Sequence, residues 1–389
     1  METPAVAPYG LKIYPVTSAR DRKRFLDFPY RHYAGSRYFV PPLRADQEKT
    51  LDPKKNPFFE HGRIQLFLAE DGRGAVVGRV AAIVSGMHLA KYDDDVGFFG
   101  FFEAIEDYAV AEALLDAATG WLRDGGLRAV RGPVNPTIND VAGLLVEGFD
   151  RPPSILMPYN KPYYEDFLLR YGFERAMTMF AYYVHDAYLD ADRLERGAAL
   201  VRRRHPNLRV RTLDMSRYMD EALLAHEIYN EAWSGNWGSV PMTDAEFRHL
   251  ANDLKQIIEP DLVVFVEVQD EAGRWEPVAF SVSIPNLNQA IRHLKDGRLF
   301  PFGLPKLLAY AKLGAVYELR MPLLGVKRAY HGHGFDVLLI TETIRAGRAK
   351  GYDACEMSWV LESNKALTNA LDRMGTVIDK TYALYERAL

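Results

Sequence analysis

A glycine-rich turn between an apolar strand and an apolar helix is the feature that most constrains the fold of this chain. The strand pattern is "VYELRMPLLGV", the turn is "HGHG", and the helical pattern "DVLLITETIRAGRAKG" follows almost at once. Glycine permits a tight turn whose N–H groups face one concavity, and the start of the next helix adds unpaired N–H groups and partial positive charge. This order of elements predicts an anion site, in the first instance for phosphate.

The residues of the turn leave two other interpretations open. His331 and His333 could ligate a metal, but no third and fourth ligand follow at a suitable spacing. The turn could also join strand and helix without binding any ligand. We therefore expect no metal, and we expect an anion site at the turn.

Length and composition limit the class of protein. A chain of 389 residues is long for one core, so two domains are expected. The chain is 48% hydrophobic and 26% charged, which is typical of folded globular proteins, and its net charge of −4 argues against a general nucleic-acid binder. No apolar run reaches the ~20 residues that span a bilayer, and the N-terminus lacks a signal-peptide pattern. We expect a cytoplasmic protein, with peripheral contact to the inner membrane as a further option.

The order of strand and helix patterns is similar in the two halves of the chain. Each half reads as hairpin strands, then strand–helix–strand, then helix–strand. In each half an asparagine begins a short helix that reaches a glycine, Asn160 to Gly172 and Asn364 to Gly375. These patterns predict an α/β fold of two lobes, residues 1–190 and 191–389, each with a central mixed sheet flanked by helices.

The stretch from "GVKRAYHGHGFDVLLITETIRAGRAKGY" to "MSWVLESNKALTNALDRMG" resembles the GNAT superfamily of acyl-CoA-dependent N-acyltransferases. In that family the pyrophosphate loop has Arg or Gln, then Gly, then Gly or Ala. Here His331, Gly334 and Asp336 take these places. The resemblance implies acyl-CoA as a substrate, and it implies donor contacts from Leu324, Val326, His331, Gly332, His333, Gly334, Phe335, Asp336 and Asn364.

Asp336 departs from the family pattern, because a carboxylate beside a pyrophosphate repels it. We expect its side chain to turn away and cap its own helix. The corresponding turn of the first half has no glycine, and it carries Glu103, Glu106 and Asp107. We therefore expect the first lobe not to bind CoA.

The groups that move protons are less clear from the sequence. The family resemblance implies a tyrosine donor at a position that is Leu371 here. Tyr382 or Tyr385 could replace it, although strand tyrosines are more often core residues. Glu231 and Glu362 are the candidate general bases, and a solvated helix position is the alternative for Glu231.

The segment 297–314, "GRLFPFGLPKLLAYAKLG", combines apolar, aromatic and basic residues. It could cover a long acyl chain or lie on an anionic membrane, or it could be a helix packed in the core. A larger set of motifs resembles a bacterial group of double-GNAT proteins that includes bacterial ceramide synthase. These motifs are "GFFGFFE", "MPYNKPYY", "NEAW…NWG", "PNLNQA", "GRLFPFG" and "GVKRAYHGHGFD". The resemblance implies transfer of a long-chain acyl group to a sphingoid base. An acetyltransferase for a soluble amine and a non-catalytic GNAT-fold binding module are the alternatives.

Overall fold

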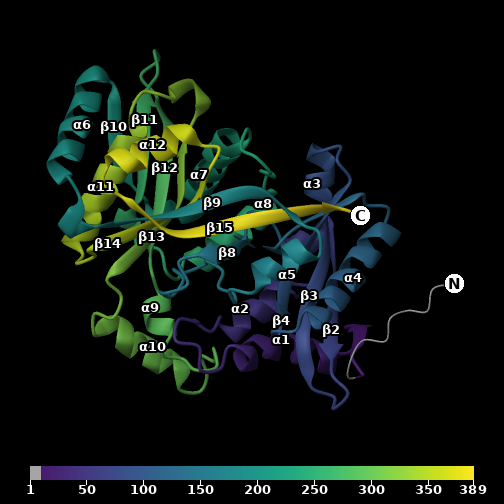
Figure 1. Cartoon of the computed structure of the whole chain (residues 1–389). Helices are drawn as coiled ribbons and strands as arrows, with labels where there is room; N and C mark the ends of the chain where they lie inside the picture. The colour runs from purple at the N-terminus through teal and green to yellow at the C-terminus, as the bar shows by residue number, and fades with distance from the viewer. Residues whose placement is uncertain (1–9) are drawn as a thin grey trace. The chain divides into compact units, whose positions relative to one another are not determined.

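The computed structural model describes residues 10–389, which form two compact α/β units (Figure 1). Unit 1 comprises the chain up to Thr178 together with residues 291–308 and 381–389, and unit 2 comprises residues 179–290 and 309–380. Each unit contains mixed β-sheet and helices, as predicted. Unit 1 therefore includes two segments that follow residue 190 in the chain.

Unit 1 contains a sheet in the strand order β1-β2-β3-β4-β5-β15. Of the strand pairs described in this unit, β4 and β5 run parallel and the others run antiparallel. The strands are β1 (Lys12–Pro15), β2 (Gly62–Glu70), β3 (Val76–Ser85), β4 (Val96–Ala104), β5 (Ala129–Gly132), β6 (Val134–Asn135), β7 (Val141–Ala142), β8 (Leu144–Glu147) and the end of β15 (Val377–Ala388). The helices are α1 (Ala19–His32), α2 (Arg44–Thr50), α3 (Gly86–Lys91), α4 (Tyr108–Asp124) and α5 (Tyr164–Arg170).

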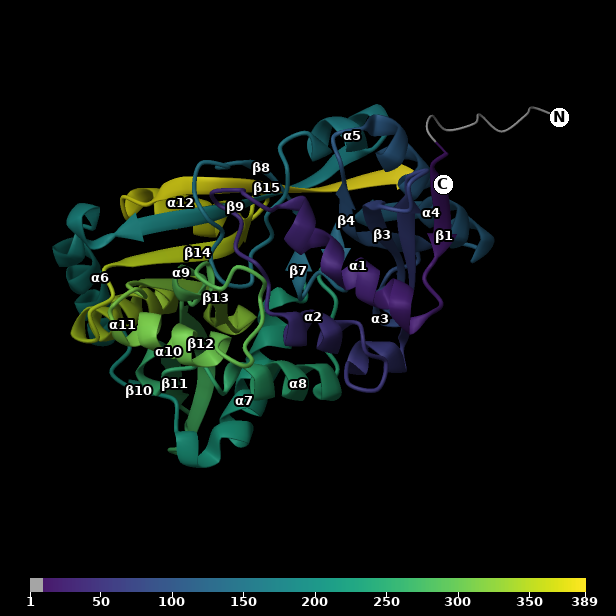
Figure 2. The ribbon, with the colours of Figure 1, turned by 90° about the horizontal axis from the view of Figure 1, so that it is seen from below.

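Helices α1 and α4 cover opposite faces of the sheet of unit 1 (Figure 2). Successive residues of a strand point to opposite faces. On β3, a Cβ at Gly78 would lie 2.6 Å from the Leu114 side chain of α4. The next side chain, Arg79, donates to the Phe25 carbonyl of α1 at 2.9 Å. The small residue at position 78 thus permits close packing of α4, and its neighbour anchors α1.

Unit 2 contains a sheet in the strand order β9-β14-β13-β12-β11-β10. Strands β13 and β14 run parallel, and the other described pairs run antiparallel. The strands are β9 (Glu174–His185), β10 (Leu208–Thr212), β11 (Val263–Gln269), β12 (Trp275–Pro285), β13 (Glu318–Val326) and β14 (Ala354–Leu361). The helices are α6 (Ala191–Arg204), α7 (Tyr218–Trp233), α8 (Asp244–Leu254), α11 (Phe335–Ala349) and α12 (Lys365–Arg373). The short helix α9 (Asn288–Ile291) and α10 (Gly303–Lys312) cross the sequence boundaries of the two units.

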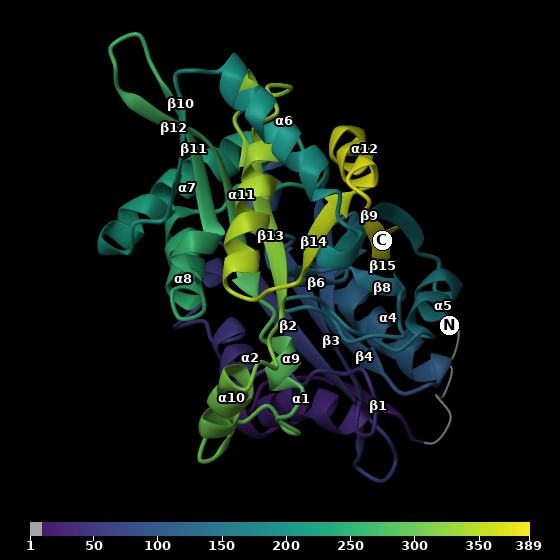
Figure 3. The same ribbon diagram turned by 90° about the vertical axis from the view of Figure 1, so that its left-hand side faces the viewer.

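In unit 2, α11 and α6 lie along one face of the sheet and α7 lies on the other (Figure 3). Leu324 and Val326 of β13 pack in the cluster that contains Phe335, Leu338 and Leu339 of α11. Between them, Gly325 faces α7, since a Cβ there would lie 2.5 Å from the Trp233 ring. The strand therefore holds α11 with its even-numbered residues and α7 with its glycine.

The structure confirms the strands and helices predicted around the glycine turn. At α8, Thr243 and Glu246 form a capping box. The basic segment at 202–213 is the end of α6 followed by β10. The core-packing interpretation of 297–314 is wrong for its helix, because α10 has no buried residue. Across residues 10–389, no helix has the length and apolarity that a membrane span requires.

Candidate active site

Strands β13 and β14 separate halfway along β13. Their parallel pairing runs from Glu318–Ala354 to Met321–Met357. The next residue is Pro322, which has no N–H group to donate. Beyond it, the described pairs of β13 join Leu323 to Val326 with β12 alone, while β14 pairs with β9. The separation leaves one edge of β13 without a neighbouring strand over its last residues.

The backbone of β13 presents two N–H groups to this open edge. Lys327 donates its N–H to the Val278 carbonyl of β12 at 2.9 Å. In an antiparallel pair, every second residue bonds the partner strand and those between point away from it. Leu324 and Val326 lie three residues and one residue before Lys327, so their N–H groups point away from β12. Two backbone donors a dipeptide apart therefore face the same side, as a developing oxyanion requires.

The turn after β13 has the geometry of an anion cradle. Gly332 has φ +79° and Gly334 has φ +83°, a conformation that strains other L-residues. Gly334 is also the N-cap of α11, and no side chain caps this helix. Within residues 10–389, the N–H groups of Gly332, Gly334, Phe335 and Asp336 donate to no protein acceptor. Four donors with no acceptor at a helix start fit an anionic ligand such as a pyrophosphate.

Three side-chain contacts hold the turn in place. Glu231, at the end of α7, accepts the backbone N–H of Arg328 at 3.1 Å. The guanidinium of Arg328 donates to the hydroxyl of Ser234 at 2.8 Å. His331 contacts the Val326 carbonyl through Nε2 at 3.0 Å, which folds the turn back onto β13. The contact at Glu231 supports the loop, although the sequence suggested this carboxylate as a general base.

The charge near the turn comes from α6 as well as from the turn itself. His205, just after α6, stacks on His333 with ring centroids 5.0 Å apart. Desolvation lowers the pKa of His205, and the positive charges of His333 and Arg204 lower it further. Arg203 and Arg204 are exposed. By contrast, Lys327 is buried and pairs with Glu276 at 2.8 Å and Glu227 at 3.5 Å, so its positive charge adds little to the potential at the turn.

Asp336 occupies the first turn of α11 and is half-buried. The prediction that it caps its own helix is wrong, since α11 has no side-chain cap. Its carboxylate stays in the first turn, where it interacts favourably with the helix dipole and unfavourably with any bound anion.

Most of the residues predicted to contact acyl-CoA lie at one edge of unit 2. Because β13 and β14 are parallel, their carboxyl ends meet at that edge, which brings the turn, Glu362 and Asn364 to the same end of the sheet. Glu362 is exposed and follows β14 directly. Asn364 caps α12, because its side chain accepts the Leu367 N–H at 3.2 Å. Tyr382 belongs to unit 1, where its side chain is fully buried.

A buried polar network on β13 and β14 was not predicted from the sequence. Arg320 donates through Nε to the Ser358 hydroxyl at 3.0 Å, and Ser358 donates to Glu356 at 2.8 Å. Lys380 lies 3.6 Å from Glu356 and also contacts Asp379. Each of these side chains is at most 5% exposed. Glu356 and Ser358 alternate with Cys355 and Met357 along the sequence. This alternation could have been used to predict that one face of the strand is polar.

Within residues 10–389, no group of three His, Cys, Asp or Glu side chains has the arrangement of a metal site. The single cysteine, Cys355, has its thiol desolvated, which raises its pKa to about 12. A thiol with so high a pKa is a poor nucleophile.

Comparisons with known proteins agree with this geometry. No family model matches the chain. Bacterial ceramide synthase from Caulobacter vibrioides (strain NA1000 / CB15N) is 40% identical over 385 residues, which cover 97% of this chain and 98% of that protein. The chain belongs to the family of this bacterial ceramide synthase. Protein YghO of Escherichia coli (strain K12) is 36% identical over 374 residues, 95% of this chain and 93% of its own length.

The fold is that of tandem GNAT proteins. A tandem GNAT protein from the clavulanic acid biosynthesis pathway superposes with a TM-score of 0.56 at 12% identity, over 97% of this chain and 98% of its own. The family and the fold together identify the chain as an acyltransferase, which favours an enzyme over a binding module.

Proposed function

We propose that this protein transfers an acyl group from a CoA thioester to a primary amine, and that its substrates are a long-chain acyl-CoA and a sphingoid base. The observation that carries the transferase site is the uncapped start of α11, where four N–H groups have no protein acceptor. The lipid acceptor is supported by the relative named bacterial ceramide synthase, which is 40% identical.

The donor would bind along the turn and the open edge of β13. The N–H groups of Gly332, Gly334 and Phe335 would hold the pyrophosphate, with His331 and His333 beside them. Arg203 and Arg204 would add positive potential from the end of α6. Asp336 opposes this charge, so backbone donors carry most of the proposed binding.

The thioester carbonyl would then lie beside β13. The N–H groups of Leu324 and Val326 would stabilise the oxyanion that forms when the neutral amine attacks. As the tetrahedral intermediate collapses, the C–N bond is kept, the C–S bond breaks, and the amine loses one proton while the thiolate gains one. Glu362, at the carboxyl end of β14, is the proposed base. Glu231 would act chiefly by supporting Arg328.

A lipid substrate would place the reaction at a membrane surface. We propose that the segment 297–314 makes that contact, since Phe300, Phe302 and Leu313 are 75%, 81% and 81% exposed. An acetyltransferase acting on a soluble amine is the second candidate, because the GNAT fold alone serves such reactions.

The test measures CoA release with a thiol reagent from palmitoyl-CoA and acetyl-CoA in parallel, with sphinganine in mixed micelles as acceptor. We expect release from palmitoyl-CoA, dependent on sphinganine and abolished by Gly334→Trp. Gly351→Ala is the matched control, because Gly351 has φ +85° at the other end of α11 and has no atom within 4 Å of an added Cβ. Release from acetyl-CoA with a soluble amine alone would favour the second candidate, and no release with any donor would overturn the proposal.

A further inference from the structure

Unit 1 contains a pocket of about 390 Å³ that is rich in arginine and has no part in the donor site. Four arginines line it: Arg24, Arg31, Arg44 and Arg298. The one acidic residue in its lining is Asp27. The chain as a whole carries a net charge of −4, so the positive charge of this pocket is opposite in sign to the net charge of the protein.

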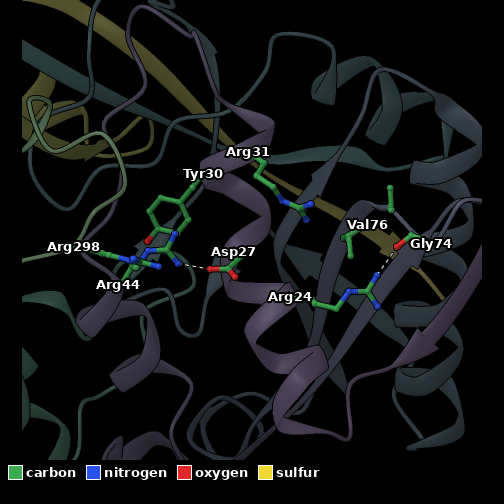
Figure 4. Close-up of a pocket in the computed structure, with 9 residues that line it drawn as sticks. Arg24, Asp27, Tyr30, Arg31, Arg44, Gly74, Val76 and Arg298 are labelled. Carbon is green, nitrogen blue, oxygen red and sulfur yellow. Dashed lines mark hydrogen bonds and ion pairs between the residues drawn. The ribbon is translucent and has the colours of Figure 1, made fainter.

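The pocket is assembled from four segments of unit 1 (Figure 4). Helix α1 supplies Arg24, Asp27 and Arg31, which are three and four residues apart and therefore share one helix face. Arg44 comes from the first residue of α2, and Arg298 comes from the segment 291–308. The Gly74–Val76 turn between β2 and β3 completes the lining.

Two of the arginines are held in fixed positions. Arg44 contacts the Asp27 carboxylate, donates through Nε to the Asp296 carbonyl at 2.9 Å, and lies over the Tyr30 ring at 4.0 Å. Arg24 donates to the Gly74 carbonyl at 2.9 Å and pairs with Glu70 at 2.6 Å. The carboxylates of Asp27 and Glu70 offset most of the charge of Arg44 and Arg24. These two arginines therefore chiefly shape the walls of the pocket.

The other two arginines, Arg31 and Arg298, have at most a weak ion pair within the described part of the chain. Arg31 is exposed, and its side chain has no ion pair or hydrogen bond within the described part of the chain. Arg298 has a side chain that is 59% exposed and a single weak pair with Asp296 at 3.5 Å. Guanidinium groups bind phosphate oxygens in a bidentate manner, so two lining arginines with little or no compensation fit a phosphate group.

The residues next to Arg298 indicate where that phosphate comes from. Phe300 and Phe302 follow it by two and four residues and are 75% and 81% exposed, and Leu308 is 52% exposed. Exposed aromatic rings next to basic side chains are typical of surfaces that enter the interface of an anionic bilayer. A soluble phosphate ester would give the two phenylalanines no role.

We propose that this pocket binds the phosphate of an anionic phospholipid headgroup, with Phe300 and Phe302 inserted into the same bilayer. Arg31 and Arg298 contact the headgroup, and Arg44 and Tyr30 hold the wall behind it. The inference does not depend on the acyl acceptor, since membrane docking and acyl transfer are measured separately.

The test is co-sedimentation of the full chain with vesicles of phosphatidylcholine alone and of phosphatidylcholine with phosphatidylglycerol. We expect binding only with phosphatidylglycerol, weakened roughly 30-fold in Arg31→Glu/Arg298→Glu, from about a fivefold loss for each basic residue. Arg128→Glu is the control for each single variant, Arg31→Glu and Arg298→Glu, because it makes the same charge change in unit 1 at a side chain that is 83% exposed and outside the pocket. Phe300→Ser/Phe302→Ser should weaken binding while leaving all four arginines in place.

Two results would overturn the proposal. Equal losses in Arg31→Glu, Arg298→Glu and Arg128→Glu, each a single charge reversal, would show general electrostatic attraction without a headgroup site. Calorimetric binding of inorganic phosphate that depends on Arg31 and Arg298, together with no vesicle binding, would assign the pocket to a soluble phosphate. Both measurements remain informative if the protein releases no CoA from any donor.

Discussion

The two units contain the same strand–helix–strand arrangement, and they differ in what fills the gap between its strands. In unit 1, β4 and β5 pair in parallel from Val96–Ala129 to Phe98–Arg131 and then separate, as β13 and β14 do in unit 2. Beyond the separation, residues of β6 in unit 1 lie against β4 and occupy the gap between β4 and β5. Asn135 accepts the Phe101 N–H at 2.6 Å, and a Cβ at Gly100 would lie 1.7 Å from the Val134 carbonyl.

The helix that follows each first strand differs in the same way. In α4 of unit 1, the Asp107 side chain caps the first turn by accepting the Ala109 N–H at 3.0 Å. In α11 of unit 2, Gly334 occupies the cap position and no side chain caps the helix. The difference teaches that one arrangement can serve structure or binding. It is structural where the chain satisfies its own polar groups, and it can bind a ligand where those groups stay open.

The largest expected effect comes from giving α11 the cap that α4 has. Gly334→Asp places a carboxylate at the N-cap, where it satisfies the free N–H groups and repels a pyrophosphate. We expect about 100-fold weaker CoA binding by calorimetry, on the order of 3 kcal/mol. Asp and Asn both tolerate the φ of +83° better than other residues, and either Cβ would lie 2.7 Å from Val201.

Gly334→Asn is therefore the control for size and conformation. We expect it to lose only about tenfold, because it carries no charge. Equal losses in the two variants would show that space alone matters at this position. Unchanged binding in both would mean that CoA does not bind at the start of α11.

The contact of Asn135 with Phe101, in the gap between β4 and β5, should matter for stability and not for CoA binding. Asn135→Ala leaves the Phe101 N–H without its acceptor, which should lower the free energy of unfolding by about 2 kcal/mol. Urea denaturation gives the loss, and calorimetry should give an unchanged affinity for CoA. A change in CoA affinity without a change in stability would contradict the structural role of unit 1.

Unit 1 should also be sensitive to acid. Desolvation lowers the pKa of His32 to about 4, with smaller effects from Lys161 and Arg79. Tyr164 accepts the Ala104 N–H at 3.1 Å and can donate its own proton to His32 Nε2 at 2.9 Å, an arrangement that needs a neutral imidazole. The folded state thus favours neutral His32. The stabilising contribution is complete above the ordinary pKa of ~6.5 and is lost as the pH falls towards 4.

We expect wild type to lose about 1.5 kcal/mol more than His32→Gln between pH 7 and pH 4, after allowing for partial solvent exposure. The measurement is the free energy of unfolding in urea at each pH. Titration of carboxylates common to both proteins cancels in the difference. Parallel pH profiles would show that His32 is not the acid-sensitive group.

Periodic patterns were enough to predict the elements that carry the donor site. β13, the glycine turn and α11 follow from apolar spacing and glycine, because these signals are local. Helix α6 was not predicted, although Leu194, Ala198 and Val201 repeat at helical spacing. Helix α1 was also missed, since Pro29 lies inside it.

Other features depend on contacts that sequence spacing does not reveal. Glu231 holds the N–H of Arg328, which is 97 residues away. The arginine pocket joins α2 to a segment more than 250 residues later, since Arg44 donates to the carbonyl of Asp296 across a separation of 252 residues. Such long-range pairs follow from the folded topology. The proton-transfer roles of Glu231, Glu362 and Tyr382 stay predictions for the same reason.

The smallest expected effect separates what Asp336 does for its helix from what it does to the donor. A carboxylate in the first turn of α11 stabilises the helix dipole, so Asp336→Asn should lower the free energy of unfolding by about 0.5 kcal/mol. The same change removes a negative charge beside the proposed pyrophosphate site. CoA should therefore bind about threefold more tightly. Asp107→Asn at the N-cap of α4 is the control, since it removes a negative charge from the start of a helix in unit 1. It should lower stability by a similar amount and leave CoA affinity unchanged. Tighter binding in both variants would point to the net charge of the protein, and weaker binding in Asp336→Asn would place the donor's phosphates away from α11.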